Sequence, residues 1–159
     1  MTNTAQILIK QFSEVGEKAT GFMLQLLPDQ MDVKVYDDGA EWTVREVCLH
    51  IVEVEGSVMR LIDNVLSGGE GVPEDFDLDR YNESKVKKIG HLSREEIVEK
   101  FSDLRAETIR KIEELKQEDF DMVGRHAFLG KSTVKEMFRM MNVNINLHIR
   151  DIKRVLQDK

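Results

Sequence analysis

The fold is decided by residues 43–66, which read TVREVCLHIVEVEGSVMRLIDNVL. Thr43, followed three residues later by Glu46, forms a capping box, which is a start signal for a helix. Behind it, apolar residues recur every three or four positions, as on one face of a helix; they are Val44, Val47, Ile51, Val54, Val58, Leu61 and Val65. Gly68 follows the last of them and suits the left-handed turn after a helix. This stretch therefore predicts a long amphipathic helix.

Three further segments carry the same helical periodicity. They span residues 4–27, 93–116 and 132–156. The first ends before Pro28, because the residue that precedes a proline resists the helical conformation. The second begins at a capping box of Ser93 and Glu96, and the third has Ser132 or Thr133 as its cap. Together with residues 43–66, these segments predict an all-α fold of four long helices.

The composition fits one globular domain with an acidic surface. The chain has 159 residues, of which 41% are apolar and 33% charged, so we expect a single domain over residues 1–159. The net charge of −7 argues against nucleic acid or an anionic membrane as a partner. No apolar stretch approaches the ~20 residues of a membrane span, and no signal-peptide pattern opens the chain. We therefore expect a cytoplasmic protein.

Two of the connections between these helices carry signals of their own. Residues 67–92 are acidic in their first half and basic in their second. This connection is too long for a turn and predicts a long crossover between the second and third helices of a bundle. Residues 119–131 contain Gly124 and Gly130, which predict a hairpin-like excursion before the fourth helix.

His148 is the first candidate for chemistry. It falls near the centre of the apolar stripe of the fourth helix, between Ile145 and Ile152. A buried polar side chain there needs a partner. Asn144 and Asp151 lie one turn before and after it, along the same edge of the helix. A core histidine bonded to one of these neighbours is the simplest interpretation of the pattern.

A metal site is the second interpretation, and it requires His50. This histidine lies at the edge of the apolar stripe of the second helix, so His50, Asn144 and His148 converge if the second and fourth helices face each other. Two imidazoles can bind a divalent cation such as zinc or nickel, which activates a bound water. Asp151 or Glu53 would then orient a ligand or act as a base. The spacing of the residues leaves both interpretations open.

Other residues have plainer roles. Cys48 points away from His50 on the same helix and is expected to be a small core residue. His91 and His126 are expected to face solvent in connections, with a pocket mouth as the alternative for His126. Trp42 is expected to fix the start of the second helix against the core. Methionines 137, 140 and 141 fit either core packing or an adaptable apolar ligand pocket.

Several short stretches resemble the DinB-like (YfiT-like) metalloenzyme family. They are WTVREVCLHI at 42–51, YNESKV at 81–86, SREE at 93–96, LGKSTVKEM at 129–137 and NINLHIRD at 144–151. The resemblance implies an up-down-down-up four-helix bundle, often dimeric, with a three-histidine site for a divalent metal. His50 and His148 match two of the three ligand positions. Asn144 stands where most members have histidine, and related mycothiol-dependent isomerases resemble the pattern with a glutamate there.

The resemblance implies a bacterial metal-dependent transferase or hydrolase of small molecules, and some members of the family resemble enzymes that use a low-molecular-weight thiol. His50 and His148 would be ligands to zinc or nickel, Asn144 a weak third ligand, and Asp151 a residue acting behind them. Two alternatives remain at this point. The chain is a metal-free module that binds a small apolar molecule, or it is a dimeric scaffold. The homodimer is expected from the resemblance alone.

Overall fold

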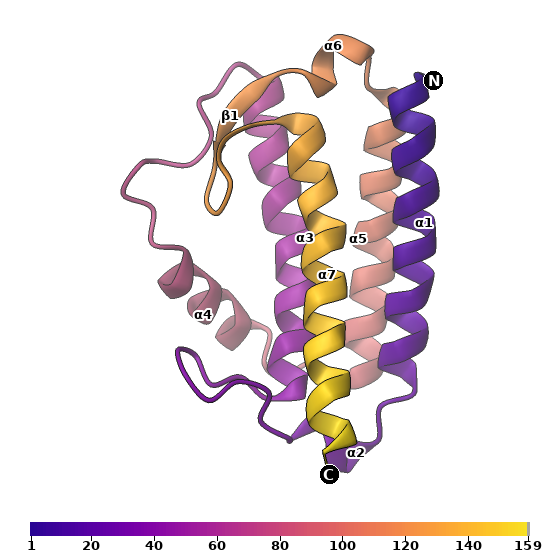
Figure 1. Ribbon diagram of the computed structural model, residues 1–159, viewed down its shortest axis with the longest axis vertical. Helices are drawn as coiled ribbons and strands as arrows, with labels where there is room; N and C mark the ends of the chain where they lie inside the picture. Colours follow the sequence, from indigo (N-terminus) through magenta and orange to yellow (C-terminus); the bar gives the residue numbers. More distant parts are fainter. Residues whose placement is uncertain (159) are drawn as a thin grey trace.

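The computed structural model describes residues 1–158, and within them four long helices form a bundle (Figure 1). They are α1 (Asn3–Leu24), α3 (Val44–Leu66), α5 (Arg94–Glu114) and α7 (Val134–Gln157). In Figure 1, α1 and α7 run in one direction and α3 and α5 in the other. The predicted all-α fold and its up-down-down-up order are thus confirmed. Lys159, the last residue of the expected domain, lies outside the described residues.

The long helices begin close to where the sequence places them, because their capping signals are used. In α3, α5 and α7 the cap hydroxyl accepts a hydrogen bond from the N–H three residues on, and the glutamate there accepts one from the cap's N–H. The pairs are Thr43 with Glu46, Ser93 with Glu96, and Thr133 with Glu136. The end of the first helix differs from its prediction, because α1 stops at Leu24 and not at the expected Leu27. Pro28 then opens the short helix α2 (Pro28–Met31), since proline fits the first turn.

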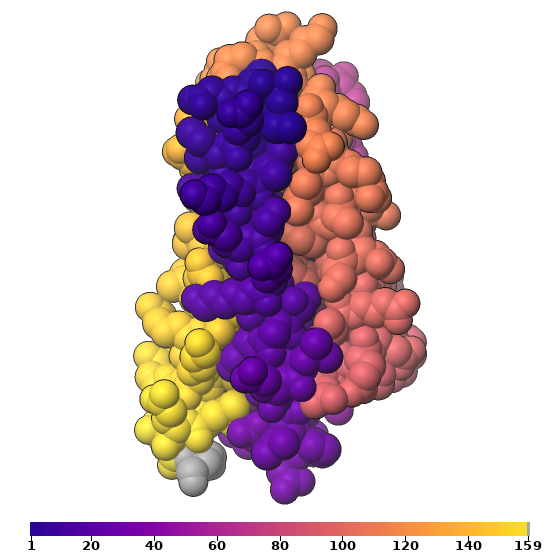
Figure 2. Space-filling model, turned by 90° about the vertical axis from the view of Figure 1, so that its right-hand side faces the viewer, coloured from indigo at the N-terminus to yellow at the C-terminus, as the bar shows by residue number. Residues whose placement is uncertain are grey.

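The four helices bury two apolar clusters, and each cluster takes residues from all four. Figure 2 shows α1 between α5 on one side and α7 on the other. Large side chains fill the interior, among them Phe12, Phe101, Phe120, Phe138, Leu49 and Ile112, all of them fully buried. No helix within residues 1–158 is long and apolar enough to cross a membrane.

The two connections differ in how well the sequence predicts them. The long crossover after α3 contains a helix, α4 (Leu78–Lys88), that was not predicted and that lies beside α3. Of its residues only Val86 is buried, so α4 has almost no apolar stripe. The excursion before α7 does form a hairpin: the short helix α6 (Gln117–Phe120) leads into antiparallel β1 (Val123–His126) and β2 (Gly130–Thr133).

A buried polar cluster ties all four long helices together. Arg105 of α5 donates 2.7 Å hydrogen bonds to Glu55 Oε1 on α3 and to Asn142 Oδ1 on α7, and a 3.3 Å bond to the carbonyl of Phe12 on α1. Thr108 donates to the other Glu55 oxygen over 2.9 Å. Since an unpaired buried charge is costly, this cluster fixes the relative heights of the helices. The sequence analysis did not predict it.

Candidate functional site

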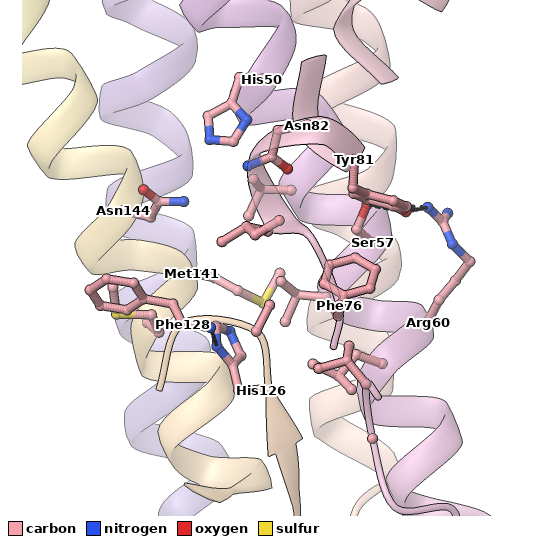
Figure 3. A pocket seen from close by; sticks show the side chains of 18 of the residues that line it. His50, Ser57, Arg60, Phe76, Tyr81, Asn82, His126, Phe128, Met141 and Asn144 are labelled. Carbon is pink, nitrogen blue, oxygen red and sulfur yellow. Dashed lines mark hydrogen bonds between the residues drawn. The ribbon is translucent and has the colours of Figure 1, made fainter. Parts of the chain in front are cut away.

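A cavity of about 560 Å³ opens between α3, α4, α7 and the tip of the β hairpin (Figure 3). Its walls are mainly apolar, and they include Val54, Leu61, Phe76, Phe128, Met140 and Met141. Toward one end of the cavity, His50, Asn82 and Asn144 extend toward one another from three different helices. An apolar cavity of this size with a few convergent polar groups is typical of a small-molecule site.

His50 lies between two other rings at this end of the cavity. Its ring centroid is 4.9 Å from that of His148, in an edge-to-face arrangement, and 4.8 Å from that of Trp42 on the other side. The residue is 6% exposed, and its Nδ1 has no hydrogen-bond partner. Burial, together with the neighbouring His148, lowers the pKa of His50 to about 3. The ring is therefore neutral and keeps a lone pair for a ligand.

Which nitrogen of the His148 ring carries the proton follows from its hydrogen bond with Tyr36, which in turn bonds to Asp151. Tyr36 OH donates to Asp151 Oδ2 over 2.8 Å and lies 2.9 Å from His148 Nδ1. A phenol has one proton, and here Asp151 accepts it. His148 Nδ1–H must therefore donate to the Tyr36 oxygen, which leaves the lone pair on His148 Nε2. Burial lowers the pKa of His148, although the charge of Asp151 opposes this shift, so the ring is neutral.

Asp151 reaches the histidine pair through its hydrogen bond with Tyr36 and through its charge, which acts on His148. Its other oxygen accepts 3.2 Å bonds from Arg150 and Arg154, and it does not line the cavity. Although burial raises the pKa of Asp151, its bonds from Tyr36 and Arg150 outweigh burial and hold that pKa below its usual value. Burial and the bond to Asp151 raise the pKa of Tyr36, so Tyr36 keeps its proton. Asp151 thus bonds to Tyr36 behind the histidine pair and does not face the cavity.

Asn144 is the third candidate donor, beside His50 and His148. It lies on α7, one turn before His148, and its half-buried side chain lines the cavity (Figure 3). Within residues 1–158, no three His, Cys, Asp or Glu side chains come together as a metal-holding group. The donor set that fits a divalent cation is therefore two neutral imidazoles, one with an unpartnered nitrogen, and one amide oxygen. This set is weaker than three imidazoles.

The other residues singled out from the sequence fall into two groups. Cys48 is buried in the core, as predicted, and burial raises the pKa of its thiol to about 12. His91 is exposed. His126 is only 9% exposed and lines the cavity, so the solvent-facing expectation is wrong and the pocket alternative is correct. The Nδ1 of His126 accepts hydrogen bonds from the N–H groups of Phe128 and Leu129. These bonds fold the tip of the hairpin back over the His126 side chain.

The methionines divide between the two roles considered for them, and Trp42 has the role expected for it. Met137 is a fully buried core residue, Met140 lines the cavity, and Met141 does both. Trp42 packs against the core at the start of α3 and also covers His50.

The sequence analysis missed Tyr36 and left Tyr81 and Asn82 without a role. One signal was available for the tyrosines. The chain has only two, and both stand in polar connections rather than in the apolar stripes of the four long helices. An aromatic side chain in such a place needs a partner, and here each tyrosine bonds to residues at the cavity or next to it.

Comparison with known proteins places this site in a family. The sequence matches the DinB superfamily over residues 4–152, and the chain belongs to this superfamily. No curated protein matches it.

Solved structures share its fold at low sequence identity. YfiT from Bacillus subtilis, described as a probable metal-dependent hydrolase with an unusual four-helix bundle topology, superposes with a TM-score of 0.78 at 18% identity, over 99% of this chain and 89% of that one. A mycothiol-dependent maleylpyruvate isomerase gives 0.76 at 11% identity, over 96% and 63%. The colibactin self-resistance protein ClbS, solved with double-stranded DNA, gives 0.72 at 11%, over 96% and 94%.

Proposed function

We propose that this chain is a divalent-metal-dependent transferase or hydrolase of small molecules. His50 and His148 would hold the cation, zinc or nickel, with the Asn144 amide oxygen as third donor. The observation that carries the proposal is a pair of neutral imidazoles whose centroids lie 4.9 Å apart: the buried His50, which lines the polar end of an apolar cavity, and the half-buried His148 beside it. The descriptions of YfiT and of the maleylpyruvate isomerase support this class of chemistry.

The residues around the pair prepare it for such a role. A bound divalent cation supplies Lewis acidity and lowers the pKa of a water or thiol that it coordinates. Tyr36 accepts the His148 Nδ1 proton and so keeps Nε2 available, and the negative charge of Asp151 behind Tyr36 makes that nitrogen more basic. Trp42 covers His50 and keeps bulk water away from it.

The cavity sets the kind of substrate. Its volume of about 560 Å³ suits a small molecule with an apolar body, and a low-molecular-weight thiol as co-substrate agrees with the isomerase relative. We expect no nucleic-acid substrate, because the net charge is −7. The ClbS complex makes binding of double-stranded DNA a necessary control. The resemblance adds the expectation of a homodimer, and we propose that it acts in the cytoplasm.

A second function is favoured by one observation. The position of the third ligand holds Asn144, and within the described chain no third His, Cys, Asp or Glu side chain joins the histidine pair in a metal-holding group. A member of the superfamily that binds a small ligand in the same cavity without metal, or serves as a dimeric scaffold, would have this donor set.

Calorimetric titration of zinc and nickel into EDTA-treated protein separates these functions. We expect the wild-type protein to bind one cation, and His50→Ala and His148→Ala each to lose at least tenfold in affinity. His91→Ala, a histidine on the surface, is the matched control and should bind as the wild type does. Equal binding by all four proteins would contradict the proposed ligands. No binding by any of them would support the metal-free function.

A further inference from the structure

A second polar cluster stands on the cavity wall, apart from the histidine pair. Arg60 Nη2 lies 3.2 Å from Ser57 Oγ and 3.4 Å from Tyr81 OH, and these two hydroxyl oxygens are 3.1 Å apart. Arg60 and Ser57 come from α3 and Tyr81 from α4, and all three line the cavity. We call these three residues the Arg60 cluster (Figure 3).

The backbone of α3 makes room for this arginine. A Cβ atom on Gly56 would lie 3.3 Å from Arg60 Nη1, tighter than ordinary side-chain contacts. The guanidinium thus folds back over the glycine, one turn earlier on the helix. With Ser57 and Tyr81 on its other side, Arg60 is held in one place although it is exposed.

The positive charge of the Arg60 cluster has no acidic partner. Among the described residues, no carboxylate oxygen lies within 4.0 Å of Arg60, in a chain with 30 acidic and 23 basic side chains. The Lys85 ammonium adds a second positive charge 5.3 Å from the centre of the Tyr81 ring. Although burial raises the pKa of Tyr81, the bonds to Ser57 and Arg60 and the charges of Arg60 and Lys85 lower it overall.

The free donors of this cluster match a carboxylate. Arg60 uses only Nη2 in hydrogen bonds within the described chain, which leaves Nη1 and Nε as donors. Each of these groups carries N–H that can donate a charge-assisted hydrogen bond to a carboxylate oxygen. In Figure 3, the Arg60 cluster and the pair of His50 and Asn144 stand on different sides of the cavity, with Asn82 between them in this view.

We propose that the cavity binds an amphipathic carboxylate. Its carboxylate bonds to Arg60 and Tyr81, its apolar body lies against walls such as Phe76 and Met141, and its far end faces His50. This assignment names the substrate class of the proposed function, but it rests on the Arg60 cluster and not on a metal.

The test uses decanoate and its neutral counterpart decanamide, titrated by calorimetry into EDTA-treated protein. We expect the wild-type protein to bind decanoate more tightly than decanamide. Arg60→Gln should weaken decanoate binding about tenfold, the loss of one charge-assisted contact, and change decanamide binding less than twofold. Arg60→Lys should restore part of the decanoate affinity. Arg80→Gln, which removes an exposed α4 arginine outside the cavity, is the charge-matched control and should have no effect.

Three outcomes would overturn the assignment. The first is that Arg60→Gln weakens the binding of decanoate and of decanamide equally. The second is that Arg80→Gln weakens decanoate binding as much as Arg60→Gln does. The third is that the wild-type protein binds the two probes equally or binds neither. Circular dichroism of each variant shows that its helices are intact. Because no metal is present, this titration and the zinc titration fail independently of each other.

Discussion

The imidazole rings of His50 and His148 lie edge to face, 4.9 Å apart between centroids, at the point where the antiparallel helices α3 and α7 pass each other. Burial lowers the pKa of both rings, so two like groups stand side by side without charge repulsion. Two neutral imidazoles beside a cavity are suited to hold a cation. The predictions below test this relationship and the residues that support it.

Asn144→His should raise the affinity for zinc and nickel at least tenfold. The substitution replaces an amide oxygen by an imidazole, which both metals prefer. Calorimetric titration of the metal-free proteins measures the gain, and Asn146→His, on the exposed face of the same helix, is the control. No gain in Asn144→His would show that position 144 does not face the metal together with the two histidines.

Tyr36→Phe should lower metal affinity by ~10–100-fold, the usual effect of losing a group that orients a ligating histidine. The variant keeps the ring but removes the oxygen that accepts the His148 Nδ1 proton and the donor to Asp151. Nitrogen chemical shifts of the His148 ring should move from a single tautomer toward a mixture. Tyr81→Phe removes the other tyrosine hydroxyl of the chain and should leave both the metal affinity and the His148 tautomer unchanged. An unaltered His148 tautomer in Tyr36→Phe would contradict this chain of bonds.

The metal-free protein should lose stability as the pH falls below about 6.5. Unfolded His50 binds a proton near its ordinary pKa of 6.5, whereas the folded residue does so only near 3. Between these values the unfolded state binds more protons, so the free energy of unfolding rises with pH. At about 1.4 kcal/mol per pH unit, His50 accounts for ~2–3 kcal/mol between pH 6.5 and 4.5.

Urea denaturation of wild type, His50→Gln and His91→Gln at a series of pH values checks this dependence. The slope should flatten in His50→Gln and persist in His91→Gln, since His91 is exposed. The same slope in all three proteins would show that His50 titrates normally.

Removing either Glu55 or Arg105 alone should cost much more stability than removing both, because the charge left behind is buried without a partner. Both side chains are at most 5% exposed, and breaking a buried pair from one side costs ~3–5 kcal/mol. Arg105→Met and Glu55→Leu should each show this loss in urea denaturation, and the double variant should recover much of it. Glu41→Leu, which breaks the exposed pair with Lys34, should cost less than ~1 kcal/mol. Additive losses in the double variant would argue against coupling.

The sequence predicts the bundle well because each long helix carries an apolar stripe, and three of the four also carry a capping signal. The boxes at Thr43 and Ser93 mark the starts of α3 and α5, and the apolar stripes mark the buried faces. The helix α4 escapes prediction because it buries only Val86 and is otherwise polar. Its helical form depends on packing beside α3, which periodicity does not record.

The site is less visible in the sequence, because it joins residues that are far apart in the chain. His148 and Asn144 share a helix face and are easily found, and His50 is found if α3 and α7 are assumed to meet. Tyr36 lies in a connection whose path no local pattern fixes, so no sequence pattern predicts its bond to Asp151. The pair of Glu55 and Arg105, by contrast, could have been predicted from the sequence. Each occupies a stripe position, Glu55 four residues after Ile51 and Arg105 four after Phe101, and opposite charges at such positions indicate a buried pair.

Elemental analysis shows whether His50 and His148 together hold a divalent cation. Untagged wild-type protein and the His148→Ala variant are purified, reconstituted with zinc or nickel, dialysed and measured by plasma mass spectrometry. If the two histidines are the ligands, the wild type should retain close to one equivalent of metal and the variant almost none. No metal in the wild-type protein, or equal metal in both proteins, would contradict their role as ligands.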